Sequence, residues 1–317
     1  MFIIFEGCDG TGKSGLAGSV TAEIMVRDRD CSVHEIHRSQ LKRPPLDEYV
    51  HDVSRYKPGT QNHVVADRWH WGEEVYGPIY RDKSASTLAQ FRWIELWLAS
   101  RGVCTWHVTQ PIDRLVKRLT DRGEDYLKPE HVELVQSMFA DVAASSITRT
   151  GDVSPEGDNR ELANRIVNRA EYTEQSVLAL QDYPSYVGPA LPHTILVGDK
   201  RGGPGPYVTK SAFMPINGNS ADLLLSSLPD DWWRGVGLVN ASETGDALVP
   251  LLDALCGPTV VALGRAASDV LLDFDIEHAG VPHPRYVREY HSSKKMQYGM
   301  LIRENARTGE MSFSWPS

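Results

Sequence analysis

The sequence predicts an α/β protein in which a parallel sheet carries helices on both faces and a second, smaller α/β unit follows. Three observations predict this class. Short apolar runs alternate with segments of helical periodicity, a glycine-rich turn joins the first run to the first helical segment, and a second series of apolar runs begins after residue 190. Strands that alternate with helices favour a parallel sheet, because each helix returns the chain to the edge where the next strand begins.

The first 145 residues hold the first series of predicted elements. Strands are expected at the apolar runs 1–6, 32–36, 63–66 and 103–108. Helical spacing of apolar residues predicts helices at 14–26, 87–100, 112–119 and 129–144. The segment 38–60 contains three prolines and many polar residues, so we expect a loop there with one short helix at most.

A polar stretch at 145–159 separates the two series. It contains Thr, Ser, Gly and Pro without an apolar period, so we expect the domain boundary there, followed by a linking helix at 160–182. Strands are then expected at 194–197, 236–239 and 259–263, and helices at 247–255 and 265–272. The predicted organisation is a first domain at 1–145, a linker at 146–190 and a second domain at 191–317.

Length and composition agree with two packed domains. Of 317 residues, 41% are hydrophobic and 24% are charged. No apolar run reaches the roughly 20 residues of a membrane span, and the first apolar run lacks the basic start of a signal peptide. The four cysteines are scattered and form no C-x-x-C pair. We therefore expect reduced thiols, a cytoplasmic protein, no membrane partner and no zinc site.

The charge balance argues against a general nucleic-acid coat protein. The net charge is −9, and residues 151–317 carry −7 of it. One short stretch near the end is locally basic and faces only Glu289; it contains Arg285, Arg288, Lys294, Lys295 and Arg303. This stretch could contact phosphates or could be an ordinary solvated face.

A phosphate-binding motif follows the first predicted strand. Residues 7–14 fit G-x-x-x-x-G-K-[ST] in full, between a strand and a helix. Glycines let backbone N–H groups point at phosphate oxygens, and the helix N-terminus favours an anion. Lys13 would reach the β/γ-phosphates and the Ser14 hydroxyl would hold Mg²⁺. The expected ATP-binding residues are Gly7, Asp9, Gly10, Thr11, Gly12, Lys13 and Ser14; the alternative is a glycine-rich turn that binds nothing.

Four more residues fit phosphoryl transfer, which needs charge neutralisation and a positioned acceptor oxygen. Asp67 ends a predicted parallel strand, where it could ligate Mg²⁺ or accept the acceptor's proton. Arg68, Arg118 and Arg122 could clamp phosphates bidentately. We therefore expect Lys13 and these four residues to be catalytic. The alternative for Arg118 and Arg122 is an exposed helix face balanced by nearby acids.

The run Phe5-Glu6-Gly7-x-Asp9-Gly10-x-Gly12-Lys13-Ser14 resembles the opening of thymidylate kinases. Asp67-Arg68 matches the Asp-Arg of that family, and Arg118 and Arg122 follow Thr109-Gln110-Pro111 where the family has its basic lid. The resemblance covers about residues 1–145. It implies a P-loop kinase fold, ATP and Mg²⁺ as cofactors, a nucleotide substrate, and contact of Asp9 with a sugar hydroxyl.

The acceptor side departs from that family. Thymidylate kinases follow their second strand with Arg-Glu-Pro-Gly-Gly, whose arginine holds the acceptor 5′-phosphate; here only Arg38 remains. Of the residues that frame thymine, only Tyr76 remains in the run from Trp69 to Gly77. Trp69 and Trp71 could stack on a base or could be core residues. The expected substrate-binding residues are Asp9, Arg38, Trp69 and Tyr76.

The second half resembles the uracil-DNA glycosylase superfamily in four short motifs. They are Leu196–Asp199 with Tyr207, Val239-Asn240, Val260–Gly264 with Ala266-Ala267, and His283-Pro284. The resemblance implies a base or DNA site made of Asp199, Tyr207, Asn240 and His283. Asn240 would read an extruded base, Asp199 would orient water or stabilise a positive sugar, and His283 would meet the leaving oxygen. An active glycosylase, a base-reading module and a structural domain all remain open.

Together the halves resemble phage DNA-hypermodification kinases of the thymidylate kinase family, which phosphorylate the hydroxymethyl group of 5-hydroxymethyluracil in DNA. An acceptor inside DNA has no free 5′-monophosphate, which fits the missing Arg-Glu-Pro-Gly-Gly. This predicts DNA as a partner of the second half and, for a phage protein, the host cytoplasm. The alternatives are a free deoxynucleoside monophosphate (thymidylate) kinase, a nucleotide-switched DNA- or base-binding protein, and an active DNA glycosylase. The oligomeric state stays open.

Overall fold

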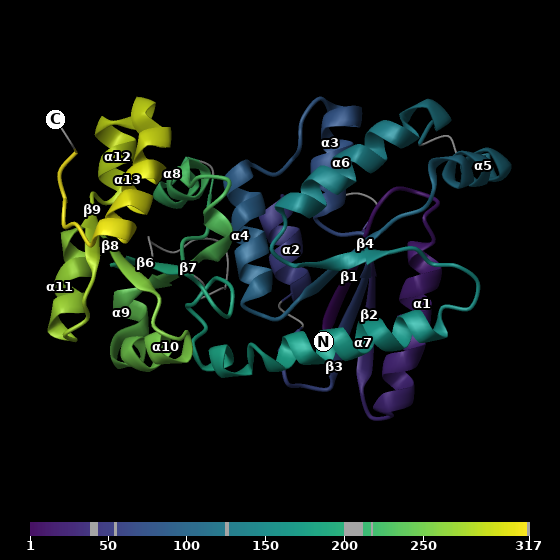
Figure 1. The fold of residues 1–317 in the computed structure, drawn as a ribbon, viewed down its shortest axis with the longest axis horizontal. Coiled ribbons are helices and arrows are strands. Elements are labelled where there is room, and N and C mark those ends of the chain that lie inside the picture. Colours follow the sequence, from purple (N-terminus) through teal and green to yellow (C-terminus); the bar gives the residue numbers. More distant parts are fainter. Residues whose placement is uncertain (39–43, 54–55, 124–126, 200–211, 217, 316–317) are drawn as a thin grey trace. The chain divides into compact units, whose positions relative to one another are not determined.

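Two parallel sheets organise the chain in the computed structural model, which describes residues 1–38, 44–53, 56–123, 127–199, 212–216 and 218–315 (Figure 1). One unit comprises Met1–Ser86 and Arg101–Leu178, and the other comprises Thr87–Ser100 and Ala179–Ser317. The protein is therefore α/β with two parallel sheets, as the sequence predicts. No helix of the described ranges combines the length and apolar character needed to cross a bilayer.

The first sheet has the strand order β2-β3-β1-β4-β5, and all its pairings are parallel. Its strands are β1 (Phe2–Glu6), β2 (Ser32–His37), β3 (Asn62–Asp67), β4 (Cys104–Val108) and β5 (Arg149–Val153). Phe5 pairs with Asp67 and Glu6 pairs with His107, so the carboxyl ends of the central strands meet at one edge. That edge carries the glycine-rich turn after β1.

Helices cover both faces of this sheet (Figure 1). They are α1 (Lys13–Arg27), α2 (Pro45–Val53), α3 (Trp71–Arg81), α6 (Val132–Ser145) and α7 (Arg160–Gln175). Helix α5 (Ile112–Arg122) packs against α6 and against the 3₁₀ turn at Pro129–His131. Ile3 and Phe5 of β1 pack with α1 and α7 in one buried cluster. Phe2 points to the opposite face, where its ring meets Tyr56 and Trp69 edge-on. The alternation of side chains along β1 thus supplies a core on each face.

Three elements of the first unit differ from the sequence expectation. The expected linker at 146–190 contains β5 and α7, which belong to this sheet and its core. Strand β5 lies at the sheet edge, and only Val153 of it is buried, so it lacks the apolar run that would identify it. Helix α3 was not expected because Gly72, Gly77 and Pro78 interrupt its helical pattern.

The second sheet has the order β7-β6-β8-β9 and is also entirely parallel. Its strands are β6 (Thr194–Gly198), β7 (Val236–Asn240), β8 (Thr259–Leu263) and β9 (Ala279–Val281). Gly198 pairs with Asn240 and Leu263 pairs with Val281, so the carboxyl ends of all four strands share one edge. Strand β9 has three residues, one of them Gly280, and is too short to be seen as an apolar run.

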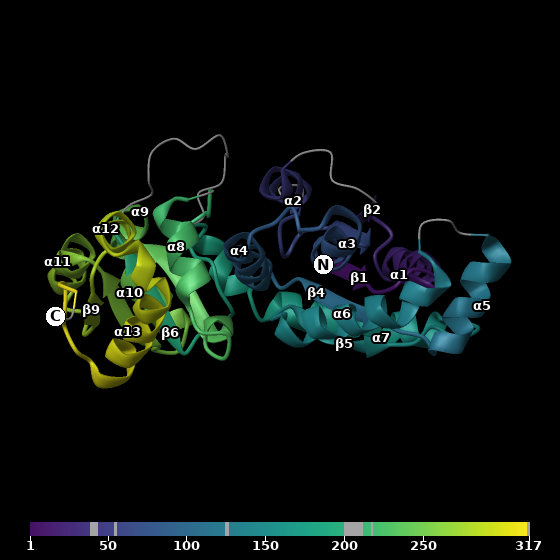
Figure 2. The same cartoon turned by 90° about the horizontal axis from the view of Figure 1, so that it is seen from above.

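Seven α-helices of the described residues belong to the second unit. They are α4 (Leu88–Ala99), α8 (Ser220–Ser227), α9 (Ala241–Thr244), α10 (Leu248–Ala254), α11 (Arg265–Asp273), α12 (Pro284–Tyr290) and α13 (Lys295–Thr308). Short 3₁₀ turns occur at Leu178–Asp182, Trp233–Gly235, Gly245–Ala247 and Ser292–Lys294. Helices α8 and α13 lie side by side, and Gly299 allows this because a Cβ there would be 1.8 Å from the Ser227 carbonyl oxygen (Figure 2).

Helix α4 belongs to the second unit although its sequence lies within the expected first domain at 1–145. The buried Arg92 guanidinium donates to the carbonyls of Leu225 and Leu228, both at 2.7 Å. The Trp93 indole donates to the Ala212 carbonyl at 2.9 Å. The two Arg92 bonds cap the end of α8, and the Trp93 bond holds the segment that precedes it. Sequence periodicity cannot reveal such bonds, because it identifies a helix without its packing partner.

Candidate active site

The glycine-rich turn between β1 and α1 forms a tight backbone cradle. Gly7, Gly10 and Gly12 have φ values of 147°, 82° and 95°. A Cβ on Gly7 would lie 2.2 Å from the Val108 carbonyl oxygen, so only glycine fits beside β4. The Thr11 hydroxyl donates to the Cys8 carbonyl at 2.9 Å and closes the turn. The turn therefore has the shape that aims backbone N–H groups at an anion.

Lys13 is buried within this cradle. Its ammonium donates to the carbonyls of Gly7 and Cys8, both at 2.7 Å. Burial, together with the nearby Arg68 guanidinium, lowers the pKa of Lys13. A cation held at this depth gains most from an anionic ligand, because phosphate oxygens would replace the hydration that burial removed.

Ser14 and Asp67 bring two oxygen ligands together beside the cradle. The Ser14 hydroxyl donates to Asp67 Oδ2 at 2.5 Å, and His37 Nδ1 lies 3.2 Å from the same oxygen. Asp67 Oδ1 is buried and has no hydrogen-bond partner in the described ranges. A hydroxyl beside a carboxylate with one unpaired oxygen fits Mg²⁺, which takes oxygen ligands and retains several waters. These residues therefore suit the expected magnesium site.

Arg68, which follows β3, is linked to the glycine-rich turn through Asp9. Its guanidinium forms an ion pair with the Asp9 carboxylate, and its backbone N–H donates to the Phe5 carbonyl at 2.9 Å. Arg68 has a φ of 67°, a left-handed conformation that side chains rarely adopt and that often marks functional sites. The structure thus gives Asp9 an arginine partner within the protein.

Residues of the motif and two arginines surround a small hollow of about 120 Å³. Its lining includes Gly10, Gly12, Lys13, Ser14, Arg68 and Arg122. Arg118 lies one helical turn before Arg122 on α5, and its guanidinium donates to the Gly10 carbonyl at 2.9 Å. The geometry therefore separates the two α5 arginines: Arg122 faces the hollow, while Arg118 supports the cradle.

Arg38, the first expected acceptor residue, is occupied within the protein. It forms ion pairs with Glu48 and Asp52 of α2, and its Nε donates to Asp52 at 3.0 Å. Asp52 also accepts from the Trp69 indole at 3.1 Å. The Trp69 ring is buried, 4.4 Å from that of Tyr49 between centroids. Trp69 therefore has the surroundings of a core residue. Core packing was one of the two interpretations of Trp69 that the sequence left open, and base stacking was the other.

Tyr76 and two acidic residues lie on or near α3. Tyr76 is buried, with the Phe139 ring at 5.7 Å. The buried Glu6 accepts the backbone N–H groups of Trp69 and Trp71 at 2.9 and 2.8 Å, which fixes the start of α3 against β1. Burial raises the pKa of Glu6 and raises that of Glu74 to about 7. The sequence assigned no role to either carboxyl, since only the fold shows that they are buried.

The second unit brings three of its four expected residues to one sheet edge. Asp199 follows β6, Asn240 ends β7 and His283 follows β9; Tyr207 lies outside the described residues. The buried Asn240 amide donates to Glu243 at 3.1 Å. His283 Nδ1 accepts the Arg285 backbone N–H at 3.0 Å, and burial lowers the His283 pKa although Asp199 opposes the shift.

Phe213 is a residue of this edge that sequence reasoning missed. Its ring lies against the end of β6, where a Cβ on Gly198 would be 2.4 Å from the ring and 3.0 Å from Asn240 Oδ1. Gly198 thus leaves room for an aromatic ring beside an amide. An aromatic face next to hydrogen-bonding atoms is the chemistry that reads a nucleobase. The available signal was the glycine at the strand end.

Comparisons with known proteins concern the first half of the chain. No family model matches the sequence. The chain is 24% identical over 144 residues to the SPbeta prophage-derived uncharacterized protein YorR of Bacillus subtilis (strain 168), an alignment that covers 45% of this chain and 82% of YorR. A crystal structure of YorR in complex with phosphorylated GDP superposes on 55% of this chain and 98% of YorR, with 20% identity and a TM-score of 0.45.

A structure of deoxyadenosine kinase from M. mycoides with products bound covers 54% of this chain and 100% of that enzyme, with 16% identity and a TM-score of 0.33. A second structure of that kinase, with bound dATP, covers 53% of this chain with a TM-score of 0.32. The first half of the chain is thus similar to YorR in sequence, and these similarities carry no information about the second half.

Proposed function

We propose that this protein is an ATP- and Mg²⁺-dependent phosphotransferase that phosphorylates the hydroxymethyl group of 5-hydroxymethyluracil in DNA. The observation that carries the kinase proposal is the paired Ser14 and Asp67 beside the Lys13 cradle, with Asp67 Oδ1 buried and unpaired within the described ranges. Phosphoryl transfer depends on positioning and charge neutralisation, and this group of residues offers both.

In the proposed reaction each residue of the cradle has a separate task. The turn N–H groups and Lys13 would bind the β- and γ-phosphates, and Arg122 would approach the same charge from the hollow. Ser14 and Asp67 would hold Mg²⁺, which supplies charge neutralisation at the phosphates when bound. Arg68, fixed by Asp9, would stand between the donor and acceptor sides. Arg118 would position the turn through the Gly10 carbonyl.

The proposed acceptor rests on how the acceptor side is built. The Arg38 guanidinium is already paired with Glu48 and Asp52, so it offers no free fork for a 5′-phosphate. An acceptor inside DNA needs no such fork. The second unit adds an aromatic ring and a buried amide at one edge, which suits recognition of a base. Both observations support a polymeric acceptor.

A second candidate is a free deoxynucleoside monophosphate kinase, with thymidylate as its first substrate. It is favoured by the fact that the cradle, Arg68 and Tyr76 all belong to the first unit. An active DNA glycosylase is favoured instead by Asp199 and His283, which interact electrostatically at the second edge. A nucleotide-switched binding protein would hydrolyse ATP without transferring its phosphate.

The test follows the γ-phosphate of labelled ATP in the presence of Mg²⁺. Duplex DNA with thymine, duplex DNA with 5-hydroxymethyluracil, and free deoxynucleoside monophosphates are offered separately to the full chain. Label on the hydroxymethyluracil duplex alone is expected. Label on thymidylate alone would overturn the DNA acceptor but keep the kinase, and release of inorganic phosphate alone would overturn both.

Point variants are preferable to truncation in this test. Removal of residues 190–317 would take away Ala212 and α8, with which Arg92 and Trp93 of α4 form hydrogen bonds. The truncated chain would then expose a buried helix face, and loss of activity would say nothing about DNA. Strand cleavage after alkaline treatment of uracil-containing DNA is the parallel assay for the glycosylase alternative.

A further inference from the structure

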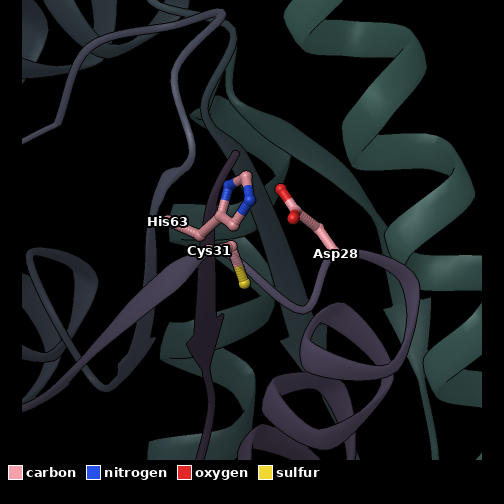
Figure 3. A group of neighbouring side chains, drawn as sticks. All are labelled: Asp28, Cys31 and His63. Atoms are coloured by element: carbon pink, nitrogen blue, oxygen red, sulfur yellow. The ribbon is translucent and has the colours of Figure 1, made fainter.

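A cysteine, a histidine and an aspartate from three parts of the first unit meet at one place. Asp28 caps the carboxyl end of α1, Cys31 immediately precedes β2, and His63 lies in β3 opposite Val33 of β2. One ligand atom from each of the three lies within 4.8 Å of the other two. In Figure 3 the imidazole and the carboxylate face one another, with the sulfur beside them.

This group is separate from the proposed donor site. Residues 28–31 precede β2 and His63 stands near the start of β3, so all three lie at the amino-terminal edge of the parallel sheet. Asp67, at the other end of β3, is four residues from His63, which is roughly 13 Å along a strand. The group therefore takes no direct part in phosphoryl transfer.

The His63 ring is held in one orientation by contacts on its other side. The Met1 α-amino nitrogen lies 2.7 Å from His63 Nδ1 and donates to Glu174 at 2.9 Å. Nε2 is free for a ligand on the side of Asp28 in the tautomer whose Nδ1–H donates to the Met1 amine nitrogen (Figure 3). A metal binds the neutral imidazole through one ring nitrogen, and the Met1 contact leaves one nitrogen of His63 for that purpose. A ring nitrogen fixed by a second partner is typical of metal-binding histidines.

The other two ligands are accessible. The Cys31 thiol is free and half-buried, and the carboxylate of Asp28 accepts the Asp30 backbone N–H at 3.1 Å, which leaves further oxygen lone pairs. Tetrahedral Zn²⁺ separates its ligand atoms by about 3.3–3.6 Å, calculated from Zn–S, Zn–N and Zn–O bonds of about 2.0–2.3 Å. Atoms that already lie within 4.8 Å reach this spacing through small side-chain rotations.

We propose that Asp28, Cys31 and His63 form a Zn²⁺ site that ties the α1–β2 connection to β3. Sulfur, imidazole nitrogen and carboxylate oxygen are the ligands that Zn²⁺ takes in proteins. Cys31 binds as the thiolate and releases its proton to solvent, and water completes the fourth position on the exposed side. The sequence predicted no zinc site because the four cysteines form no C-x-x-C pair. A site whose ligands come from a turn and from a neighbouring strand has no such contiguous pattern, so the sequence alone could not reveal it.

The test uses the full chain with Co²⁺ as a spectroscopic substitute for Zn²⁺, in excess Mg²⁺ so that the oxygen ligands at Ser14 and Asp67 are occupied. A sulfur-to-cobalt charge-transfer band with one equivalent of Co²⁺, abolished by Zn²⁺, is expected. Zn²⁺ should also raise the melting temperature, because a ligand that binds the folded state stabilises it. Absence of the band at micromolar protein would overturn the proposal.

Variants identify the site. Cys31→Ser should remove the band and lower Zn²⁺ affinity by more than the 10- to 100-fold typical of a lost outer-shell partner. Asp28→Asn should weaken binding, and because Asp28 is partly exposed it should still fold. Cys256→Ser, at an exposed cysteine of the second unit, is the matched control and should change nothing. A band that survives Cys31→Ser, or is lost in Cys256→Ser, would overturn the assignment.

Discussion

The carboxyl edges of the two parallel sheets carry opposite kinds of chemistry. The edge of the first sheet is charged: Lys13, Arg68 and Asp67 are buried or nearly so and interact with one another or with the turn. The edge of the second sheet presents the Asn240 amide and the Phe213 ring beside Gly198. Ligands of open α/β sheets bind at this edge in general, so side chains rather than topology set the difference.

The difference shows what each edge is suited to bind. Fixed charges in a water-poor cradle favour a polyanion such as a triphosphate, because little reorganisation is needed on binding. A neutral amide next to an aromatic face favours a planar, hydrogen-bonding ligand such as a base. Under the proposed function the first edge performs the chemistry and the second reads the substrate, and the predictions below test that division of labour.

The largest expected effect is that of Lys13→Ala, which removes the buried cation of the first edge. We expect phosphoryl transfer to fall by about 10³-fold or more, because preorganised charges at transferring phosphates typically contribute this much. The measurement is initial velocity with labelled ATP and the acceptor that the proposed-function test identifies. Lys57→Ala, at an exposed lysine of the same unit, is the matched control. Full activity in Lys13→Ala would end the assignment of the donor site.

A somewhat smaller effect is expected for Asp67→Asn, by about 10²- to 10³-fold. The amide keeps the shape of the side chain but removes the negative charge, so the Mg²⁺ concentration needed for half-maximal velocity should rise as well. Velocity as a function of Mg²⁺ concentration measures both changes, and Asp141→Asn on the exposed face of α6 serves as a control. An unchanged Mg²⁺ requirement would place the metal ligand elsewhere.

The sequence predicted strands β1 to β4 of the first sheet, but it did not predict strand β5 or the packing partners of helices α4 and α7. β1 to β4 are apolar runs, and the motif after β1 is contiguous, so pattern and spacing identify both. Strand β5 was not predicted because an edge strand can be polar. Helix α7 was expected to be a linking helix, but it covers the first sheet. Helix α4 showed its period in the sequence, but its partner α8 follows more than 100 residues later.

The same contrast holds for the sites. The cradle was predictable as a turn because Gly7 to Ser14 adjoin in the chain and fit one contiguous motif between a strand and a helix. The occupation of Arg38 by Glu48 and Asp52 was not predictable, since ion pairing depends on the placement of α2. Phe213 and the group at Asp28 became visible only when the fold joined separate segments. Whether the second half belongs with the glycosylases remains a prediction.

A moderate effect is expected at the second edge. Phe213→Leu should raise the KM for DNA by about 30-fold without changing transfer to any free nucleotide, because base–aromatic stacking contributes about 1–3 kcal/mol. Phe274→Leu is the matched control, since Phe274 is also half-buried but follows α11 at the start of the connection to β9. Equal loss with DNA and with free nucleotides would make the second edge a structural support of the kinase.

The smallest expected effect concerns the free energy of unfolding and the carboxyl group of Glu74 on α3, near the first edge. Burial raises the pKa of Glu74 from its ordinary 4.5 to about 7, so the folded state binds its proton more tightly than the unfolded state. Between these two pH values the folded state holds more protons, and the free energy of unfolding should therefore fall as pH rises and level off above pH 7.

Glu74→Gln should remove this pH dependence. A glutamine can still accept from the Ser84 hydroxyl, now at 2.9 Å from Glu74 Oε1, and has no charge to bury. We expect the variant to match the parent protein near pH 4 and to be more stable by roughly 1 kcal/mol at pH 8, after allowance for solvent screening at this partly exposed side chain. Urea denaturation at both pH values measures the difference, with Glu161→Gln on the exposed face of α7 as control. A variant less stable than the parent at pH 8 would mean that the ionised carboxylate of Glu74 stabilises α3. Burial of this carboxylate would then not lower the free energy of unfolding.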